Sequence, residues 1–516
     1  MNLRRQPFEL RPDARRVLLR PFMASVVVKP TGHPEPSRRL LDVLARVLML
    51  DDDSVAETLD SVLAEFHDRH VNIRAIFLER FSKLAPLIPV DRPLDEARKL
   101  LIGSYFTNEY SLESSALFNP SIVAAPDQSG LAPGELRFIL SLRATGEGHI
   151  SSITFRSGIA AADGTVRLDP VSKFVHSPRP EPAAKYDLRL FRRKLFELGV
   201  PHHAARAATA DLPDVFHMPE LVTRTAALRR DGSDPEIVRA GERAVSLAEA
   251  NYTVRFKDGL SLSEKVIFPY SPLESNGIED ARFVRFTDDD GKVTYYATYT
   301  AYNGADVFPQ IVATPDFCTF HASTLNGPAV ANKGFALFPR KINGHYAMLS
   351  RQDGVNIHLM FSDHPHFWYE SQVIVRPAQP WEFTQLGNCG SPIETDAGWL
   401  VLTHGVGPMR KYCIGAVLLD RNDPSQVIGR LKEPLLRPAL DERDGYVPNV
   451  VYTCGALLHH GVLVIPYAVS DTATRFASVA LDELIDALRR GAQDAGCKKP
   501  VARRPSVLGG SRGWFP

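Results

Sequence analysis

The stretch Asp290-Gly291-Lys292, followed by Val293–Thr300 (VTYYATYT), is a polar turn that leads into an apolar and aromatic run. β-Branched and aromatic residues favour strands, and an Asp-Gly pair is typical of a tight turn. Four other runs share this form and also follow polar turns: Leu136–Leu142 (LRFILSL), His345–Ser350 (HYAMLS), Trp399–Thr403 (WLVLT) and Val462–Tyr467 (VLVIPY). The last four of the five recur roughly every 50 to 60 residues, a period that suits one four-stranded blade. The pattern predicts a mainly β protein, a five-bladed β-propeller. Periodicity alone leaves open an irregular β-sandwich or two unrelated β-domains.

The intervals outside this repeat have helical patterns. The first gap is about 100 residues longer than the others, and Tyr186–Leu198 and Glu236–Ala250 within it have helical spacing. We therefore expect a helical insertion at about 165–250, between blades one and two. Apolar residues at three- and four-residue spacing in Ser37–Leu50 predict an N-terminal helical region over residues 1–112. The propeller should then occupy 113–490, with a basic tail at 491–516.

Composition excludes several classes of protein. The 516 residues include 60 Lys and Arg and 60 Asp and Glu, so net charge gives no case for binding nucleic acid or a membrane surface. Five cysteines without a Cys-x-x-Cys pair indicate reduced thiols, and the spacing of potential ligands indicates no metal site. No signal peptide or membrane span is recognisable, so the expected location is cytoplasmic.

Polar clusters beside the strands could carry chemistry. The segment Glu274–Arg282 (ESNGIEDAR) contains three carboxylates, an Asn and an Arg just before a strand. A carboxylate that is partly desolvated near an Arg can act as a general acid, although a solvated acidic loop would have the same composition.

A second set of polar residues could bind an anion. Lys333 and Arg351 flank a turn-and-strand unit, so both could face one cavity, although most Lys and Arg simply lie at the surface. His404 ends an apolar strand and is either a buried structural imidazole or a donor to a phosphate oxygen. Arg410, Lys411 and Tyr412 add donors nearby. No P-loop, G-x-G-x-x-G or G-x-S-x-G motif is present.

Taken in order, these clusters resemble glycoside hydrolase family 130, the mannoside phosphorylases and mannosidases. The resemblance covers about residues 115 to 485. It rests on Phe118–Ser121 (FNPS), Ser141–Ala144 (SLRA), Gly277–Arg282 (GIEDAR), Leu337–Gly344 (LFPRKING), Gly390–Ile393 (GSPI), Leu402–Val406 (LTHGV), Gly415–Asp420 (GAVLLD) and Val447–Val451 (VPNVV).

The resemblance implies a five-bladed propeller and an inverting phosphorylase that converts a β-mannoside into α-mannose 1-phosphate. Asp280 matches the family's proton donor, with the proton passing directly or through a substrate hydroxyl. The phosphate-binding positions correspond to Lys333, Arg351, His404 and Tyr412. Substrate contacts are expected from Asn119, Arg143, Asn276, Glu279, Arg282, Gln385 and Asp471.

Two residues depart from the family pattern. Gln385 stands where many members have Lys, which leaves the details of anion or sugar contact open, and Ala281 stands where many have Pro. The helical N-terminal region and the insertion fit the longer subgroup that acts on β-1,2-mannosides.

The sequence leaves two other functions open. A hydrolase of the same family would need a general base, for which Glu274, Glu394 or Asp444 are candidates. A propeller that only binds glycans should lack Asp280, which is present. The expected partners are a β-mannoside oligosaccharide and inorganic phosphate as co-substrate, with no cofactor. A homo-oligomer is left open.

Overall fold

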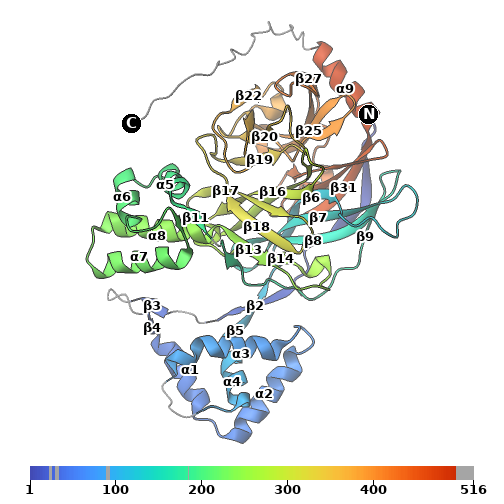
Figure 1. The fold of residues 1–516 in the computed structure, drawn as a ribbon. Coiled ribbons are helices and arrows are strands. Elements are labelled where there is room, and N and C mark those ends of the chain that lie inside the picture. The colour runs from blue at the N-terminus through green and yellow to red at the C-terminus, as the bar shows by residue number, and fades with distance from the viewer. Residues whose placement is uncertain (23–25, 29–33, 89–92, 184, 495–516) are drawn as a thin grey trace.

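The computed structural model describes residues 1–22, 26–28, 34–88, 93–183 and 185–494, and it is mainly β (Figure 1). Helices occur in three places around the strands. The N-terminal group is α1 (Arg38–Leu48), α2 (Asp52–Phe66), α3 (Ile73–Leu84) and α4 (Glu96–Tyr105); the second is α5 (Leu188–Glu197), α6 (His202–Ala208), α7 (Met218–Arg230) and α8 (Pro235–Glu249); α9 (Leu481–Asp494) follows the last strand.

The longest sheet has eleven strands in two halves. One half contains β6 (Ala116–Ala124), β7 (Leu136–Thr145), β8 (Ser151–Ala160), β9 (Val166–Leu168) and β14 (Val266–Ile267); the other contains β15 (Gly277–Thr287), β16 (Val293–Tyr302), β17 (Val307–Thr314), β18 (Thr319–Thr324), β13 (Tyr252–Arg255) and β10 (Glu181–Pro182). Within the described residues, strand pairing between β15 and β8 is limited to Gly277 opposite Ser151, so the ladder that joins the two halves is very short.

Two further sheets follow along the chain. The first contains β19 (Lys333–Leu337), β20 (Tyr346–Arg351), β21 (Ile357–Ser362) and β22 (Gln372–Val375). The second contains β23 (Gln385–Asn388), β25 (Gly398–Val406), β26 (Tyr412–Leu419) and β27 (Val427–Arg430), with β24 (Ile393–Thr395) paired to β25. All five runs predicted as strands are strands, namely β7, β16, β20, β25 and the β30 described next.

The last sheet joins the two ends of the chain. It contains β28 (Val451–Tyr452), β29 (Leu457–His459), β30 (Val462–Val469) and β31 (Ala473–Ala480), and β1 (Arg4–Leu10) forms its outer edge. Phe8 packs on Phe476 with ring centroids 5.2 Å apart, and Arg475 pairs with Glu9 at 2.8 Å. The prediction that residues 1–112 are helical is wrong for this segment, because these cross-strand contacts lie far away in sequence and leave no local signal.

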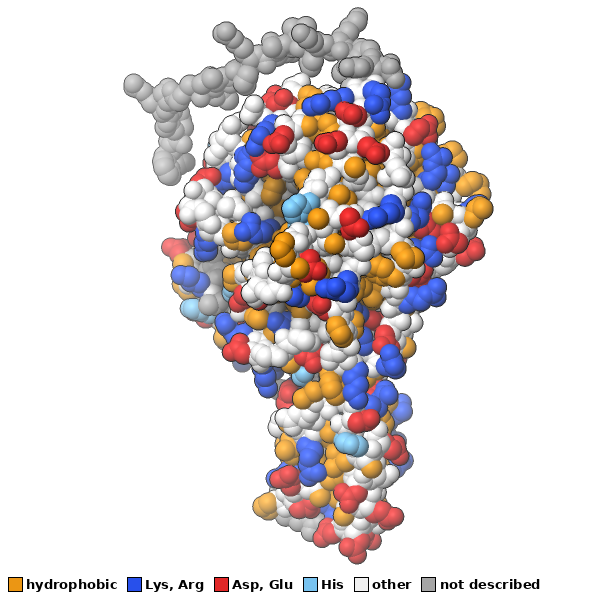
Figure 2. Space-filling view, turned by 90° about the vertical axis from the view of Figure 1, so that its right-hand side faces the viewer, with side chains coloured by type: hydrophobic (Ala, Val, Ile, Leu, Met, Phe, Trp, Pro, Cys, Tyr) orange, Lys and Arg blue, Asp and Glu red, His pale blue; other side chains and the backbone are white. Residues whose placement is uncertain are grey.

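The N-terminal helices project from the main body (Figure 2). They are connected to it through β2 (Val17–Pro21), which pairs with β5 (Thr107–Ser111), and a short β3 (Val26–Val28) and β4 (Pro34–Pro36) precede α1. Side chains of Asp51 and Asp95 cap α2 and α4 by accepting from Ser54 N and Arg98 N. Arg16, with no exposed side-chain surface, pairs with the equally buried Glu113 at 2.9 Å and fixes this connection to the body.

The predicted insertion is helical over a narrower range than 165–250. β9 and β10 belong to the long sheet, and the helices extend from α5 to α8, together with the two-residue strands β11 (Tyr186–Asp187) and β12 (Val215–Phe216). At the other end, α9 continues to Asp494, so the helix overlaps the start of the predicted tail. Residues 495–516, the rest of that tail, lie outside the described residues. Within the described part of the chain, no helix combines the length and apolarity needed to cross a bilayer.

Candidate active site

A cavity of about 170 Å³ gathers polar residues from the four larger sheets: the long sheet, the sheets that begin with β19 and β23, and the last sheet. Its lining consists of Asn119, Arg143, Asp280, Lys333, Arg351, Gln385, His404, Arg410, Tyr412, Val447, Val450, Tyr452 and Asp471. Nine of the twelve residues that the sequence analysis predicted for the site line this cavity, although they span more than 350 positions of the chain.

Bulges in two strands place the central pair of side chains. The β6–β7 register shifts between Phe118 and Ser121, and the β15–β16 register shifts between Glu279 and Arg282. Asn119 (φ 47°) and Asp280 (φ 53°) occupy the left-handed region at these bulges. Such conformations cost energy and occur where a site requires them. Asn119 Nδ2 donates to Asp280 Oδ1 at 2.6 Å, so the amide fixes the orientation of the carboxylate.

Cations surround the Asp280 carboxylate. Arg143 donates to Glu279 at 2.8 Å and to Asp280 at 3.4 Å. Burial raises the pKa of Asp280, but the charges of Arg143, Arg282 and Lys333 outweigh it and hold this pKa below its usual value. With the protein's own groups alone, Asp280 is therefore ionised at neutral pH.

Asp471 is the second carboxyl of the cavity, and it behaves in the opposite way. Burial and the negative charge of Asp280 raise the pKa of Asp471 to about 6, against the opposing effect of Arg143 and Arg410. Ser470 (φ 46°) and Asp471 (φ 51°) are two successive left-handed residues in the β30–β31 turn, which turns this carboxyl inward. The cavity thus contains two carboxyls whose pKa values differ.

Arg351 and His404 form the opposite side of the cavity. Arg351, only 9% exposed, lies opposite Lys333 in the β19–β20 register and donates from Nη1 to His404 Nε2 at 2.8 Å. Burial, together with the charges of Arg351 and Arg282, lowers the pKa of His404 well below its usual value, so the imidazole is neutral and accepts this bond. Tyr412 stacks near the imidazole, with ring centroids 6.1 Å apart.

Close packing behind this pair depends on Gly387 in β23. A Cβ at Gly387 would lie 2.5 Å from His404 Cε1 and 3.0 Å from Arg351 Cδ. Glycine is therefore needed here for close approach of the backbone.

The charge of the lining is unbalanced. Four cations (Arg143, Lys333, Arg351 and Arg410) face two carboxylates, Asp280 and Asp471. Among the described residues, no carboxylate forms an ion pair with Arg351. A buried guanidinium without a counter-charge is costly unless an anion joins it. The arrangement can therefore bind an anion with about two negative charges beside a carboxyl group.

Three of the predicted residues do not line the cavity. Arg282 lies behind it and donates to Cys389 O (2.7 Å), Asp280 O (3.0 Å) and Tyr452 Oη (2.8 Å), so it supports the Asp280 bulge. Glu279 contacts two lining cations, Arg143 at 2.8 Å and Lys333 at 3.6 Å. Asn276 is exposed outside the lining, because it precedes β15 in the turn rather than lying on its bulge.

Four of the lining residues had no site role predicted from the sequence. Arg410 had been noted only as a nearby donor, and Tyr452, Val447 and Val450 had no assigned role. Val447 and Val450 lie within a segment that carried the family resemblance, and Tyr452 follows directly after it. None of the three candidate bases for a hydrolase lines the cavity: Glu274 accepts from the buried tyrosines Tyr252 and Tyr299, Glu394 pairs with Arg340 and Arg421, and Asp444 is exposed. No group of metal-ligating side chains is found among the residues described.

Comparison with known proteins identifies the family. A family model described as "beta-1,4-mannooligosaccharide phosphorylase" matches residues 243–490. The chain is 34% identical over 278 residues to a 1,2-beta-oligomannan phosphorylase of Thermoanaerobacter sp. (strain X514), covering 51% of this chain and 91% of that protein. It is 32% identical over 279 residues to a Beta-1,2-mannobiose phosphorylase of Listeria innocua serovar 6a, covering 50% and 75%. A solved structure of the Beta-1,2-Mannobiose phosphorylase from Listeria innocua aligns with 73% of this chain and 92% of that chain, at 23% identity and a TM-score of 0.44.

The chain belongs to glycoside hydrolase family 130, as its ordered motifs predicted.

Proposed function

We propose that this protein is a glycosyltransferase-type phosphorylase that cleaves β-mannosides with inorganic phosphate and inverts the anomeric centre. The substrates would be β-1,2-linked manno-oligosaccharides, and the product α-mannose 1-phosphate. The linkage is supported by two relatives whose names specify β-1,2-linked substrates. Another relative, 34% identical over 189 residues, is a Beta-1,4-mannooligosaccharide phosphorylase, so family membership alone does not determine the linkage.

The observation that carries phosphorolysis is the buried, carboxylate-free Arg351. Arg351 has Lys333 nearby and His404 and Tyr412 at its side, and together they supply positive charge and hydrogen-bond donors for a dianion in one corner of the cavity. These four residues are called the anion corner. Water as the nucleophile would need a base there rather than cations. A phosphate dianion would balance the excess of two positive charges in the lining.

Asp280 is proposed to donate the proton to the interglycosidic oxygen, directly or through a substrate hydroxyl. Without phosphate, the neighbouring cations keep Asp280 ionised. A phosphate dianion beside Lys333 and Arg351 would offset these cations and raise the pKa of Asp280, so that the carboxyl can hold the proton it donates. Phosphate oxygen then bonds to the anomeric carbon as the bond to the leaving oxygen breaks on the opposite face. The leaving sugar departs with the proton from Asp280.

The remaining lining residues are proposed to position the mannoside. Asn119, Arg143, Gln385 and Asp471 offer amide, guanidinium and carboxyl groups around Asp280. Glu279 and Arg282 would act by holding Arg143 and the bulge in place. A sugar contact by Asn276 stays a prediction, since this residue lies outside the lining.

We further propose that the strands form a five-bladed propeller. A second cavity of about 480 Å³ is lined by Ile122–Ala124 of β6, Phe283–Arg285 of β15, residues 339–340, residues 391–394 and residues 455–458. Like the active-site cavity, it receives residues from both halves of the long sheet and from the three other larger sheets or the loops beside their strands. Two such cavities near opposite ends of β6 and β15 are what the two mouths of a central channel would produce.

The hydrolase alternative depends on Asp471. It is the one carboxyl besides Asp280 in the described lining, and its pKa of about 6 would suit a general base. A glycan-binding propeller without activity would not need the acid and the anion corner together. A cytoplasmic location is supported by the four described cysteines, which are all free. Assembly into a homo-oligomer is left open.

Supply of phosphate tests the proposal. Incubated with β-1,2-mannobiose, the protein should release α-mannose 1-phosphate only when phosphate is present, and should extend an acceptor from α-mannose 1-phosphate in reverse. The products and their anomeric configuration can be followed by NMR. Free mannose formed equally well without phosphate would establish the hydrolase instead, and a β-configured product would contradict inversion.

A further inference from the structure

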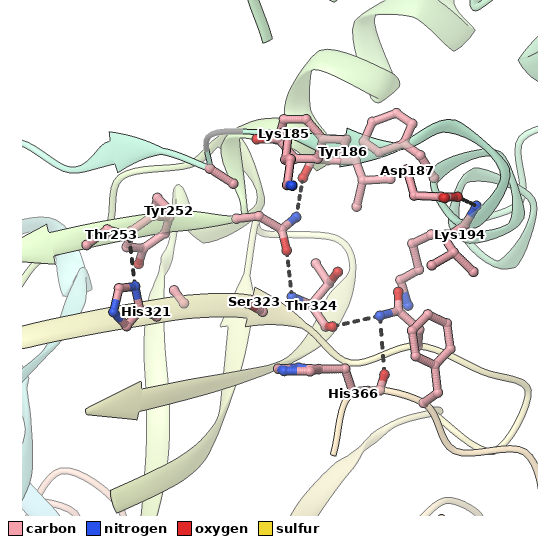
Figure 3. Close-up of a pocket in the computed structure, with 18 residues that line it drawn as sticks. Lys185, Tyr186, Asp187, Lys194, Tyr252, Thr253, His321, Ser323, Thr324 and His366 are labelled. Carbon is pink, nitrogen blue, oxygen red and sulfur yellow. Dashed lines mark hydrogen bonds between the residues drawn. The ribbon is translucent and has the colours of Figure 1, made fainter. Parts of the chain in front are cut away.

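Another cavity, of about 460 Å³, lies where the helical insertion meets the outer part of the long sheet (Figure 3). Its lining comes from the start of the insertion, from α5, from β13 and β18, and from residues 366–367. It shares no residue with the active-site cavity.

Several polar groups of this cavity have no partner in the described protein. The ring of His366 makes no hydrogen bond to the described residues, and its Nδ1 is buried. Lys185 forms no ion pair with any described carboxylate. His321 uses Nδ1 with Thr253 Oγ1 at 3.0 Å and keeps Nε2 free. Figure 3 shows Lys185 above and His366 below, with Thr324 between them, and all three line the same cavity.

The His366 ring suits a neutral partner. Burial lowers the pKa of His366, so at neutral pH it is uncharged, with one ring N–H donor and one acceptor nitrogen. A hydroxyl group, which both donates and accepts, satisfies such a ring on either nitrogen.

The walls combine aromatic surface with fixed amides. Tyr186, Phe191 and Phe367 contribute aromatic surface. Asn251 donates to Leu247 O at 2.9 Å and accepts from Thr324 N at 3.1 Å, and Asn326 donates to Thr324 O, so both amides are held rigidly. A few fixed polar groups among aromatic faces are typical of a small-molecule site, and they match the apolar ring faces and hydroxyl edges of a sugar.

The position of the cavity relates it to the active site. β18 is the third strand from β15, so about 14 Å separates them at ordinary strand spacing. Thr324 of β18 lies opposite Gln310 of β17, which lies opposite Tyr299 of β16. The next residue of β16, Thr300, lies opposite Glu279 of β15. The cavity is therefore level with Asp280 along the strands.

We propose that this cavity is a second, non-catalytic oligosaccharide site, which holds a manno-oligosaccharide chain away from its reacting end. The choice of mannosides rests on the proposed function; the site itself rests on the lining. Holding the chain here raises the local concentration of its end near Asp280, so long chains gain affinity and a disaccharide does not.

Calorimetric titration with β-1,2-mannotetraose, in phosphate-free buffer to prevent turnover, tests the site. The intact protein should bind one β-1,2-mannotetraose per chain across both sites, and a Lys185→Ala/His366→Ala variant should bind it at least about fivefold more weakly, with unchanged affinity for β-1,2-mannobiose. The matched control is His364→Ala, an exposed histidine two residues away that does not line this cavity, and it should keep the affinity of the intact protein for both ligands. Equal tetraose affinity in the intact protein and the double variant overturns the proposal, and so does a matching loss of mannobiose affinity in the double variant.

Kinetics provide an independent readout. The double variant should show a KM for β-1,2-mannotetraose raised at least about fivefold, with kcat unchanged and the KM for β-1,2-mannobiose unchanged. Equal loss on both substrates would indicate general damage and overturn the proposal. If the intact protein releases no mannose 1-phosphate from any mannoside, but the double variant still binds β-1,2-mannotetraose more weakly than the intact protein does, the proposed reaction fails while the second site holds.

Discussion

Asp280 and Asp471 are two carboxyl groups of one cavity that hold their protons with different strength. The cations beside Asp280 favour its ionised form, whereas Asp471 is buried next to that negative charge and keeps its proton to about pH 6. A reaction that needs one carboxyl to give a proton can use this difference, because the dianion that enters changes the balance at Asp280.

Replacing Asp280 tests the acid directly. Asp280→Asn keeps the size of the side chain and tolerates the left-handed backbone, but it cannot donate the proton. Loss of general acid help typically lowers the rate about 10²–10⁴-fold, so kcat should collapse while mannoside binding survives. Steady-state kinetics with circular dichroism as a check of folding would measure this. Near-normal turnover would transfer the role to Asp471.

Replacing Asp471 tests how much the burial of its carboxyl lowers stability at neutral pH. Because its folded pKa of about 6 lies above the usual Asp value of 3.8, Asp471 is harder to ionise in the folded protein, so it lowers stability as pH rises from 4 to 6 and above. Asp471→Asn should therefore raise the free energy of unfolding at pH 7.5 by up to about 3 kcal/mol, with the gain disappearing near pH 4. Urea denaturation at both pH values measures it, with exposed Asp486→Asn as control. A gain that is independent of pH would contradict the ionisation argument.

At the scale of single elements, bulges and close approaches position the site within otherwise regular strands. β6 and β15 each break register at the residue that faces the cavity, and β19 does so after Lys333. β23 contributes by lacking a side chain at Gly387, which lets the next strand bring His404 against Arg351. The anion corner is thus a consequence of how β20, β23 and β25 pack.

Adding one methyl group to β23 tests this packing. Gly387→Ala should displace His404 and Arg351 and raise the KM for phosphate about tenfold or more, approaching the effect of Arg351→Ala, with a smaller change in kcat. Gly415 lies in β26 of the same sheet, and Gly415→Ala is the matched control, since its Cβ would instead meet the Trp381 ring at 2.4 Å. This variant should lower Tm without changing the KM for phosphate. An unchanged phosphate KM in Gly387→Ala and Arg351→Ala would show that the anion corner is misplaced.

At the scale of the whole molecule, the sequence predicted the residues of the site better than it predicted which strands pair with one another. Strand runs such as Val293–Tyr302 were recognisable because β-branched and aromatic residues act locally, and the ordered motifs identified the family. Arg4–Leu10 was not recognised as a strand, because an edge strand with two arginines depends on a distant partner. Tyr452 was missed because its function arises from contacts with Arg282 and His404, which no local pattern reports.

The pairing of β1 with β31 determines when the sheet that contains them can be completed during synthesis. Glu9 and Arg475, which face each other across these strands, lie 466 residues apart in the chain. β1 leaves the ribosome long before its partner and stays unpaired until Ala473–Ala480 has been synthesised, and the edge of β31 is covered only when the two strands meet. Ordering of the N-terminal residues and of the final sheet is therefore a single late event, and such a long-range closure is a slow step of folding.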